Sequence, residues 1–257
     1  MTSNDKKIIY NLLKTASSNI QGYKSQDFTF DISKFKDDIK IIKSENNTTN
    51  INFSKNEVIQ EIKNASIDTI NNKITKCNRC RLCETRKNVV PGIGCKSPLV
   101  LVIGEGPGYE EDLKGEPFVG PAGQLLDKML AAIQLSRNSN TYIANIVKCR
   151  PPQNRIPYPE EADACISFLQ AQIVALKPKM ILCAGSTAAK NILKSPLGVT
   201  KLRGNFYEYS NIPVCVTYHP SALLRDESLK KYAWEDLKMF RQKLLELVPN
   251  YQESFRG

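Results

Sequence analysis

The stretch from 104 to 123 combines acidic side chains with a constrained backbone, and it directly follows the apolar run 99–103. It is rich in glycine and proline, more so than a simple connection between two elements requires. Glu105, Glu111 and Asp112 therefore lie just past the end of a predicted buried strand. In open α/β sheets ligands bind at this end of the strands. We expect these carboxylates to line a functional site.

Two further polar residues occupy equivalent places. Asn145 lies within the apolar run 142–147, where an unpaired amide would cost about 1 to 3 kcal/mol. His219 is the only histidine of the chain and ends the run 214–218, beside a proline. A histidine at the carboxyl end of a strand is well placed for proton chemistry. A polar ligand bound at this edge would satisfy the asparagine.

The chain has eight cysteines, which in a reducing compartment favour metal ligands or core residues over disulfides. Two sets of four thiolates could share one metal centre, and either suits iron–sulfur or zinc. The nonlocal set joins a C-x2-C pair to two later residues: Cys77, Cys80, Cys149 and Cys165. The local set starts like a ferredoxin motif: Cys77, Cys80, Cys83 and Cys95.

The residues around Cys149 favour the nonlocal set. This cysteine ends a predicted strand and precedes a stiff Pro151-Pro152 loop flanked by arginines, where a core thiol has little use. A metal ligand would hold such a loop in place. Cys183 and Cys215 instead lie within apolar runs, and we expect them to be buried thiols.

The pattern from residue 98 onward predicts alternating strands and helices. Strands are expected at 99–103, 142–147, 180–184 and 214–218, and helices at 122–134, 160–176, 186–194 and 228–247. This alternation predicts a parallel sheet with helices on both faces. Residues 1–55 are rich in Ser, Asn, Asp and Lys, so we expect a weakly ordered extension before a domain over 56–257.

The net charge of the chain indicates which class of partner it binds. The formal charge is +10 and the pI is near 9.1, which indicates a polyanionic partner, with nucleic acid ahead of a membrane surface. No stretch approaches 18 continuous apolar residues, so we expect a cytoplasmic protein that does not enter a membrane.

Several motifs in one order resemble those of family 4 uracil-DNA glycosylases. They are Gly104-Glu105-Gly106-Pro107-Gly108, Pro117-Phe118-Val119-Gly120, Asn145 before Lys148-Cys149-Arg150-Pro151-Pro152-Gln153-Asn154-Arg155, and His219-Pro220-Ser221 before Leu223-Leu224-Arg225. The resemblance covers roughly 75 to 250 and leaves out the extension. It implies a three-layer α/β/α sandwich with a four-stranded parallel sheet, and a 4Fe-4S cluster on the nonlocal set of cysteines.

The resemblance also implies a uracil pocket in a monomeric enzyme that acts on uracil-containing DNA. Uracil contacts are expected from Gly104, Gly106, Phe118, Asn145 and His219, with the phenylalanine stacking on the base. The asparagine amide would accept from N3–H and donate to O4, a pattern that cytosine reverses. The histidine would stabilise the negative charge of the departing base.

The sequence does not assign the activation of water to a single carboxylate. The aspartate of the related family 1 motif is replaced by Gly106, so we assign the role jointly to Glu105 and Glu111, with Asp112 as a third candidate. DNA contacts are expected from Arg155, Ser221, Leu223, Leu224 and Arg225, one of the leucines wedging into the gap left by the flipped nucleotide.

Two alternatives differ in function class. A damaged-base or single-strand binding protein without turnover would retain uracil-DNA and form no abasic product. A Rossmann-type nucleotide enzyme requires G-x-G-x-x-G, and the glycine spacing of 104–108 does not match it.

Overall fold

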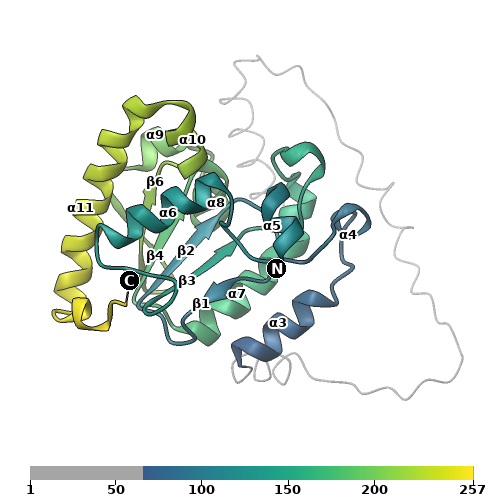
Figure 1. Cartoon of the computed structure of the whole chain (residues 1–257), viewed down its shortest axis with the longest axis horizontal. Helices are drawn as coiled ribbons and strands as arrows, with labels where there is room; N and C mark the ends of the chain where they lie inside the picture. Colours follow the sequence, from purple (N-terminus) through teal and green to yellow (C-terminus); the bar gives the residue numbers. More distant parts are fainter. Residues whose placement is uncertain (1–65, 257) are drawn as a thin grey trace, which may run out of the picture. The chain divides into compact units, whose positions relative to one another are not determined.

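A computed structural model describes residues 66–256 (Figure 1). The extension predicted over 1–55 and its boundary with the domain lie outside the described residues and stay predictions. Within 66–256 no helix combines the length and apolar character needed to cross a bilayer.

Four parallel strands form the centre of the sheet, as predicted. Their order is β3 (Thr141–Asn145), β2 (Val100–Gly104), β4 (Met180–Ala184) and β6 (Ile212–Thr217). Residues of β2 are buried on both faces, Val100 and Val102 packing on one side and Leu101 and Ile103 on the other. This alternation explains why the sequence shows a continuous apolar run.

The sheet has six strands rather than the four expected, because an antiparallel strand is added at each edge. β1 (Ile93–Gly94) pairs with β3 and is too short for a sequence pattern. β5 (Phe206–Tyr209) pairs with β6 through a tight turn at Ser210 and Asn211, whose φ angles are 51° and 65°. That turn contains no glycine, the strongest hairpin signal in a sequence.

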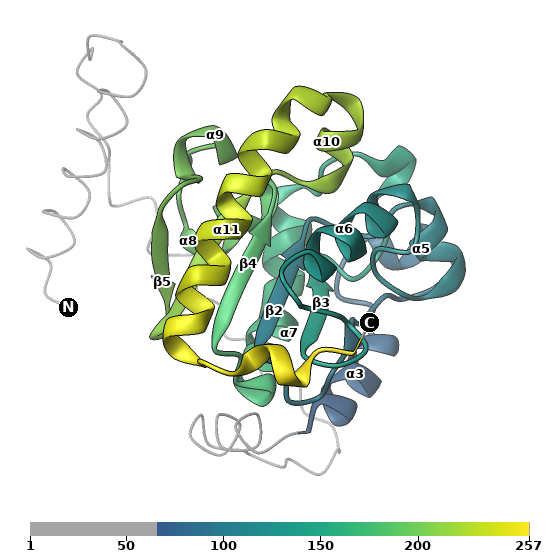
Figure 2. The same cartoon turned by 60° about the vertical axis from the view of Figure 1, so that its left-hand side comes forward.

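Helices cover both faces and complete the three layers (Figures 1 and 2). One face carries α3 (Ile67–Thr75), α7 (Pro159–Leu176) and α8 (Ser186–Leu193), and the other carries α6 (Pro121–Ala131) and α11 (Lys230–Leu247). The four predicted helices correspond to α6, α7, α8 and α11. Cys183 and Cys215 are fully buried in the strands, as expected.

Short helices occupy the connections between these elements. They are α4 (Leu82–Thr85), α5 (Tyr109–Lys114), α9 (Val199–Leu202), α10 (Pro220–Arg225) and the 3-10 turns Pro152–Asn154, Glu227–Leu229 and Tyr251–Ser254. Of these, α5 and α10 follow the carboxyl ends of β2 and β6. They bring the predicted site residues to one edge of the sheet.

Candidate active site at the carboxyl edge of the sheet

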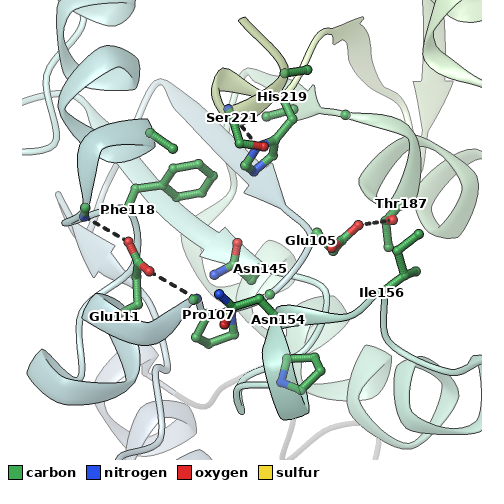
Figure 3. A pocket seen from close by; sticks show the side chains of 18 of the residues that line it. Glu105, Pro107, Glu111, Phe118, Asn145, Asn154, Ile156, Thr187, His219 and Ser221 are labelled. Atoms are coloured by element: carbon green, nitrogen blue, oxygen red, sulfur yellow. Dashed lines mark hydrogen bonds between the residues drawn. The ribbon is translucent and has the colours of Figure 1, made fainter. Parts of the chain in front are cut away.

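A cavity of about 700 Å³ opens at the carboxyl ends of the parallel strands (Figure 3). This is the edge where the sequence predicts a site, and the size is ordinary for a small-ligand pocket. Each of the four parallel strands or the turn after it contributes to the lining, which includes Glu105, Phe118, Asn145, Thr187, His219 and Arg225.

Asn145 is the last residue of β3 and points into this cavity (Figure 3). The side chain is buried, and its Oδ1 has no hydrogen-bond partner among residues 66–256. The backbone carbonyl accepts from Lys148 Nζ at 2.9 Å, so the main chain is fixed while the amide is not. A free acceptor at this depth costs about 1 to 3 kcal/mol unless a ligand pairs with it.

Phe118 is held in an uncommon backbone conformation above the asparagine. Its φ is 53°, and Arg137 donates at 2.8 Å to the carbonyl oxygens of both Pro117 and Phe118. A Cβ at Gly123 would collide with the Phe118 carbonyl, so α6 can pass beneath it only with glycine there. The ring is buried, with its centroid 5.4 Å from that of the His219 ring. It presents a fixed apolar face.

The resemblance assigns uracil contacts to Gly104 and Gly106, and these two glycines differ in whether they line the cavity. Gly104 is buried and does not line the cavity; a Cβ there would collide with Asn145 Oδ1 and the Phe118 ring. A glycine at this position leaves room for these side chains, and its expected uracil contact stays a prediction. Gly106 does line the cavity, and a Cβ there would meet the Val147 side chain at 2.7 Å.

His219 precedes α10 and has a defined tautomer. Its Nδ1 accepts the Ser221 backbone N–H at 3.2 Å and lies 2.8 Å from the Ser221 hydroxyl oxygen. An accepting Nδ1 carries no proton, so the neutral ring holds its proton on Nε2. Burial and, to a lesser extent, the positive charge of Arg225 lower the pKa of His219 to about 4, although the Glu111 carboxylate partly opposes the shift. The imidazole is therefore a neutral hydrogen-bond donor near pH 7.

Glu111 is a structural carboxylate, contrary to its shared assignment as the water activator. Its Oε2 accepts the Gly108 N–H at 3.0 Å, and its Oε1 accepts those of Val119 and Gly120 at 2.9 and 3.0 Å. Three backbone donors thus engage both oxygens. The side chain caps α5 and fixes the turn that carries Phe118.

Asp112 is also structural, whereas Glu105 faces the cavity. Asp112 is buried, and its Oδ1 accepts the backbone N–H groups of Lys87 and Asn88. Glu105 is half-buried after β2 and accepts a single hydrogen bond among the described residues, from the Thr187 hydroxyl (Figure 3). Of the three carboxylates, Glu105 alone combines a place in the cavity with an uncommitted oxygen.

A second, smaller pocket gathers cysteines from distant parts of the chain. It is lined by Cys77, Cys80, Cys83, Cys149 and Cys165. Cys95 is outside it, its N–H paired with the Thr141 carbonyl at the edge of the sheet, so the local set of four is not brought together. Within 66–256 no three His, Cys, Asp or Glu side chains are placed to hold a single metal ion.

Comparison with known proteins agrees with this geometry. The model of the family described as "Uracil DNA glycosylase superfamily" matches residues 91–238. The chain belongs to this superfamily. A Type-4 uracil-DNA glycosylase of Archaeoglobus fulgidus is 41% identical over 181 residues, which are 67% of this chain and 90% of the relative. The Type-4 enzyme of Thermotoga maritima is 42% identical over 176 residues, 67% of this chain and 91% of that protein.

A more distant relative is the Type-5 uracil-DNA glycosylase of Pyrobaculum aerophilum, 30% identical over 189 residues, 61% of this chain and 83% of the relative. Both the Type-4 and the Type-5 relatives are thus matched over most of their own length. The superfamily match includes the strand ends that carry Glu105, Asn145 and His219.

The two leucines expected to contact DNA have different environments in this member of the superfamily. Leu223 is 1% exposed and packs with Tyr218 and Ala233, so it cannot insert into a duplex without leaving the core. Leu224 is 47% exposed. The structure thus excludes Leu223 as the wedge and leaves Leu224 accessible.

The two arginines and the serine that were expected to contact DNA also differ in their hydrogen-bond partners. Arg155 donates to both carboxylate oxygens of buried Glu161, at 2.8 and 2.7 Å, and this hydrogen bonding lowers the pKa of Glu161. That guanidinium therefore anchors the loop, and because it also lines the cavity its expected contact with phosphate stays a prediction. Ser221 is bonded to His219. Arg225 lines the cavity and makes no ion pair within residues 66–256.

No role was predicted for three residues that shape the site, although Gly123 ends the glycine-rich stretch 104–123. Arg137 and Gly123 hold the Phe118 backbone, and Thr187 bonds to Glu105. The positions of Gly123 and Arg137 carry no motif, because their partners are backbone carbonyls reached through the fold. Thr187 does carry a signal, since it follows the predicted strand 180–184 at the same edge as the other site residues.

Proposed function

We propose that this chain is a DNA repair glycosylase that hydrolyses the bond between uracil and deoxyribose in DNA and leaves an abasic site. The observation that carries the proposal is the buried Oδ1 of Asn145, which has no partner among residues 66–256 and lies in a cavity that also holds a fixed aromatic ring and a neutral histidine. The names of the Type-4 relatives support the same activity.

Recognition would use the base after it has left the helix stack. The Phe118 ring supplies a stacking face, Asn145 Oδ1 accepts the uracil N3–H, and Asn145 Nδ2 donates to uracil O4. Cytosine has an acceptor at N3 and a donor at its 4-amino group, so it would meet the amide with both polarities reversed. An unpaired group on each side makes this discrimination strong.

Two side chains would share the catalysis of bond cleavage. As the bond between C1′ and N1 breaks, its electron pair moves onto the base, and His219 Nε2–H donates to uracil O2, where negative charge develops. Glu105 faces the positive charge that develops on the sugar. A water oxygen then bonds to C1′ and gives a proton to the Glu105 carboxylate.

The experiment that tests the proposal is a product assay. The purified chain is incubated with single- and double-stranded oligonucleotides that contain uracil, hypoxanthine or a thymine mispair, and free base and abasic sites are measured. Uracil release with an abasic product is expected. Tight retention of uracil-DNA without product would instead indicate a binding protein of the same fold.

The carboxylate assignment predicts opposite effects for Glu105→Gln and Glu111→Gln. Glu105→Gln should slow single-turnover uracil release about 10²-fold, at the low end of what a general base contributes, with the melting temperature nearly unchanged. Glu111→Gln weakens hydrogen bonds to three backbone N–H groups and should lower the melting temperature. Thermal unfolding and single-turnover kinetics on both variants measure this. A kinetic defect confined to Glu111→Gln would reverse the assignment.

We also infer that Cys77, Cys80, Cys149 and Cys165 hold a 4Fe-4S cluster. The donor set fits, since these thiols line one pocket, and four thiolates are the usual ligands of such clusters. Arg86 donates to Cys149 Sγ at 3.0 Å, and a hydrogen bond from a positively charged group favours the thiolate form of a ligand. Bound there, the cluster would tie the start of the domain to the loop after Asn145.

The cluster proposal predicts that only variants of the assigned ligand cysteines lose bound iron. Cys165→Ala should reduce bound iron and the broad visible absorbance of an anaerobic preparation, whereas Cys95→Ala, outside the pocket, should change neither. Iron analysis and absorbance spectra measure this. A colourless wild-type protein that carries zinc would contradict the proposal. Cys83→Ala serves as a second control, because this thiol lines the pocket without being assigned as a ligand.

The proposed active form is a monomer acting on uracil-containing DNA, because a single chain already supplies the stacking ring, the amide, the imidazole and the carboxylate that the reaction needs. Arg225 and Leu224 are the residues proposed to meet the DNA beside the flipped nucleotide. Sedimentation with and without DNA distinguishes a monomer from a dimer.

A further inference from the structure

The Glu105 carboxylate is fixed by one side chain. Thr187, in the first turn of α8, donates its hydroxyl to Glu105 Oε2 (Figure 3). No other hydrogen bond to this carboxylate occurs within residues 66–256. Both residues line the cavity. The bond therefore crosses from the end of β2 to the turn after β4 and restricts the rotation of Glu105.

The same turn touches the other proposed reacting group. Gly185 has a φ of 93°, and a Cβ there would lie 2.9 Å from His219 Cβ. Gly185 N–H donates to the Thr217 carbonyl at 2.8 Å, which ties the turn to the end of β6. The turn thus contacts His219 through Gly185 and Glu105 through Thr187.

The neighbouring hydroxyl has a different partner. Ser186 Oγ accepts the Val199 N–H at 3.1 Å and supports the start of α9. Ser186 and Thr187 are adjacent, and both line the cavity. One hydroxyl holds a piece of backbone, while the other holds a side chain that faces the ligand. This contrast separates a structural role from a positioning role.

We propose that Thr187 is a positioning residue for the reaction: its hydroxyl holds Glu105 Oε2 so that the second oxygen, Oε1, faces the sugar of the flipped nucleotide. The inference rests on the proposed function. A carboxylate that bonds through one oxygen keeps the lone pairs of the other for the developing positive charge and the attacking water. Without the hydroxyl, Glu105 would sample other rotamers, and fewer of them would be productive.

The test compares three single variants of the full-length, cofactor-loaded protein, and one combined variant with Glu105→Gln. Thr187→Val keeps the shape and removes the donor, Thr187→Ser keeps the donor, and Ser186→Ala removes the adjacent hydroxyl. Single-turnover uracil release at saturating protein gives the rate of the chemical step. Affinity is measured on DNA carrying 2′-fluoro-deoxyuridine, whose electron-withdrawing fluorine opposes cleavage. Thermal unfolding reports on stability.

Thr187→Val should slow uracil release about 10-fold, which corresponds to losing one hydrogen bond to a charged group, with unchanged affinity for the fluorinated DNA. Thr187→Ser should restore most of the rate. Ser186→Ala should lower the melting temperature and leave the rate of the folded protein near that of wild type. The combined variant Thr187→Val/Glu105→Gln should be no slower than Glu105→Gln alone.

Two results would overturn the inference while leaving the proposed function intact. One is a wild-type rate for Thr187→Val in an active protein. The other is equal loss of rate in the valine and serine variants, which would indicate a packing effect. A wild-type chain that releases no uracil would instead contradict the function itself.

Discussion

His219→Ala is expected to slow uracil release by about 10² to 10³-fold, the effect of removing one donor that stabilises developing negative charge. Uracil-DNA binding should change far less, because the donor acts mainly as charge forms on the departing base. The Ser221 contacts to Nδ1 support this role, since they leave the proton of the neutral ring on Nε2. Single-turnover kinetics and affinity for 2′-fluoro-deoxyuridine DNA separate the two effects.

Ser221→Ala is the matched control, because it removes the hydroxyl near Nδ1 and keeps the backbone N–H that sets the tautomer. Its rate should lie much closer to that of wild type. A His219→Ala protein with a wild-type rate would remove the histidine from the mechanism. If His219→Ala lost tight binding of uracil-DNA together with the rate, His219 would act in binding the substrate and not specifically in the transition state.

The low pKa of His219 also predicts how the stability of the protein depends on pH. The folded-state pKa is about 4 and the ordinary value is 6.5, so between these limits the unfolded chain takes up a proton that the folded protein does not. Stability therefore falls as the pH is lowered through this window. Because His219 is the only histidine, this share of the loss should be absent from His219→Ala. Unfolding measured from pH 7 to 4 on both proteins tests it.

The central sheet could be predicted because its strands are buried on both faces, which leaves continuous apolar runs; the run 180–184 coincides with β4. The edge strands could not be predicted in the same way. β1 has two residues, and β5 is half-buried with a turn that lacks glycine. Their pairing depends on partners that the local sequence does not specify.

The site shows the same division between local and tertiary information. Strand ends bring Glu105, Asn145 and His219 together, and their positions follow from the sheet. The separate roles of Glu105 and Glu111 do not. Both are glutamates near the end of β2, and they differ because the turn at 119–120 folds back to donate two N–H groups to Glu111. Burial of Leu223 but not Leu224 likewise depends on where α10 packs.

Asn145→Ala is expected to reduce uracil release by about 10² to 10⁴-fold while leaving the free energy of unfolding within about 1 kcal/mol of wild type. The activity loss corresponds to two hydrogen bonds to the base, each leaving a buried partner unpaired. The stability should hold because Oδ1 has no partner among the described residues, so removing it relieves a desolvation cost that offsets the small cavity created.

The control for Asn145→Ala is a polar residue of equal burial whose partners are internal. Asp112 and Asn145 are both 2% exposed, but Asp112 accepts two backbone N–H groups. Asp112→Ala should therefore lower the free energy of unfolding by about 2 kcal/mol or more, since it leaves those donors unpaired. Chemical denaturation and uracil release on both variants compare the two sites. If Asn145→Ala were as destabilising as Asp112→Ala and kept its activity when folded, the asparagine would be a structural residue. A stable, inactive protein would mean that its unpaired acceptor is retained for the base.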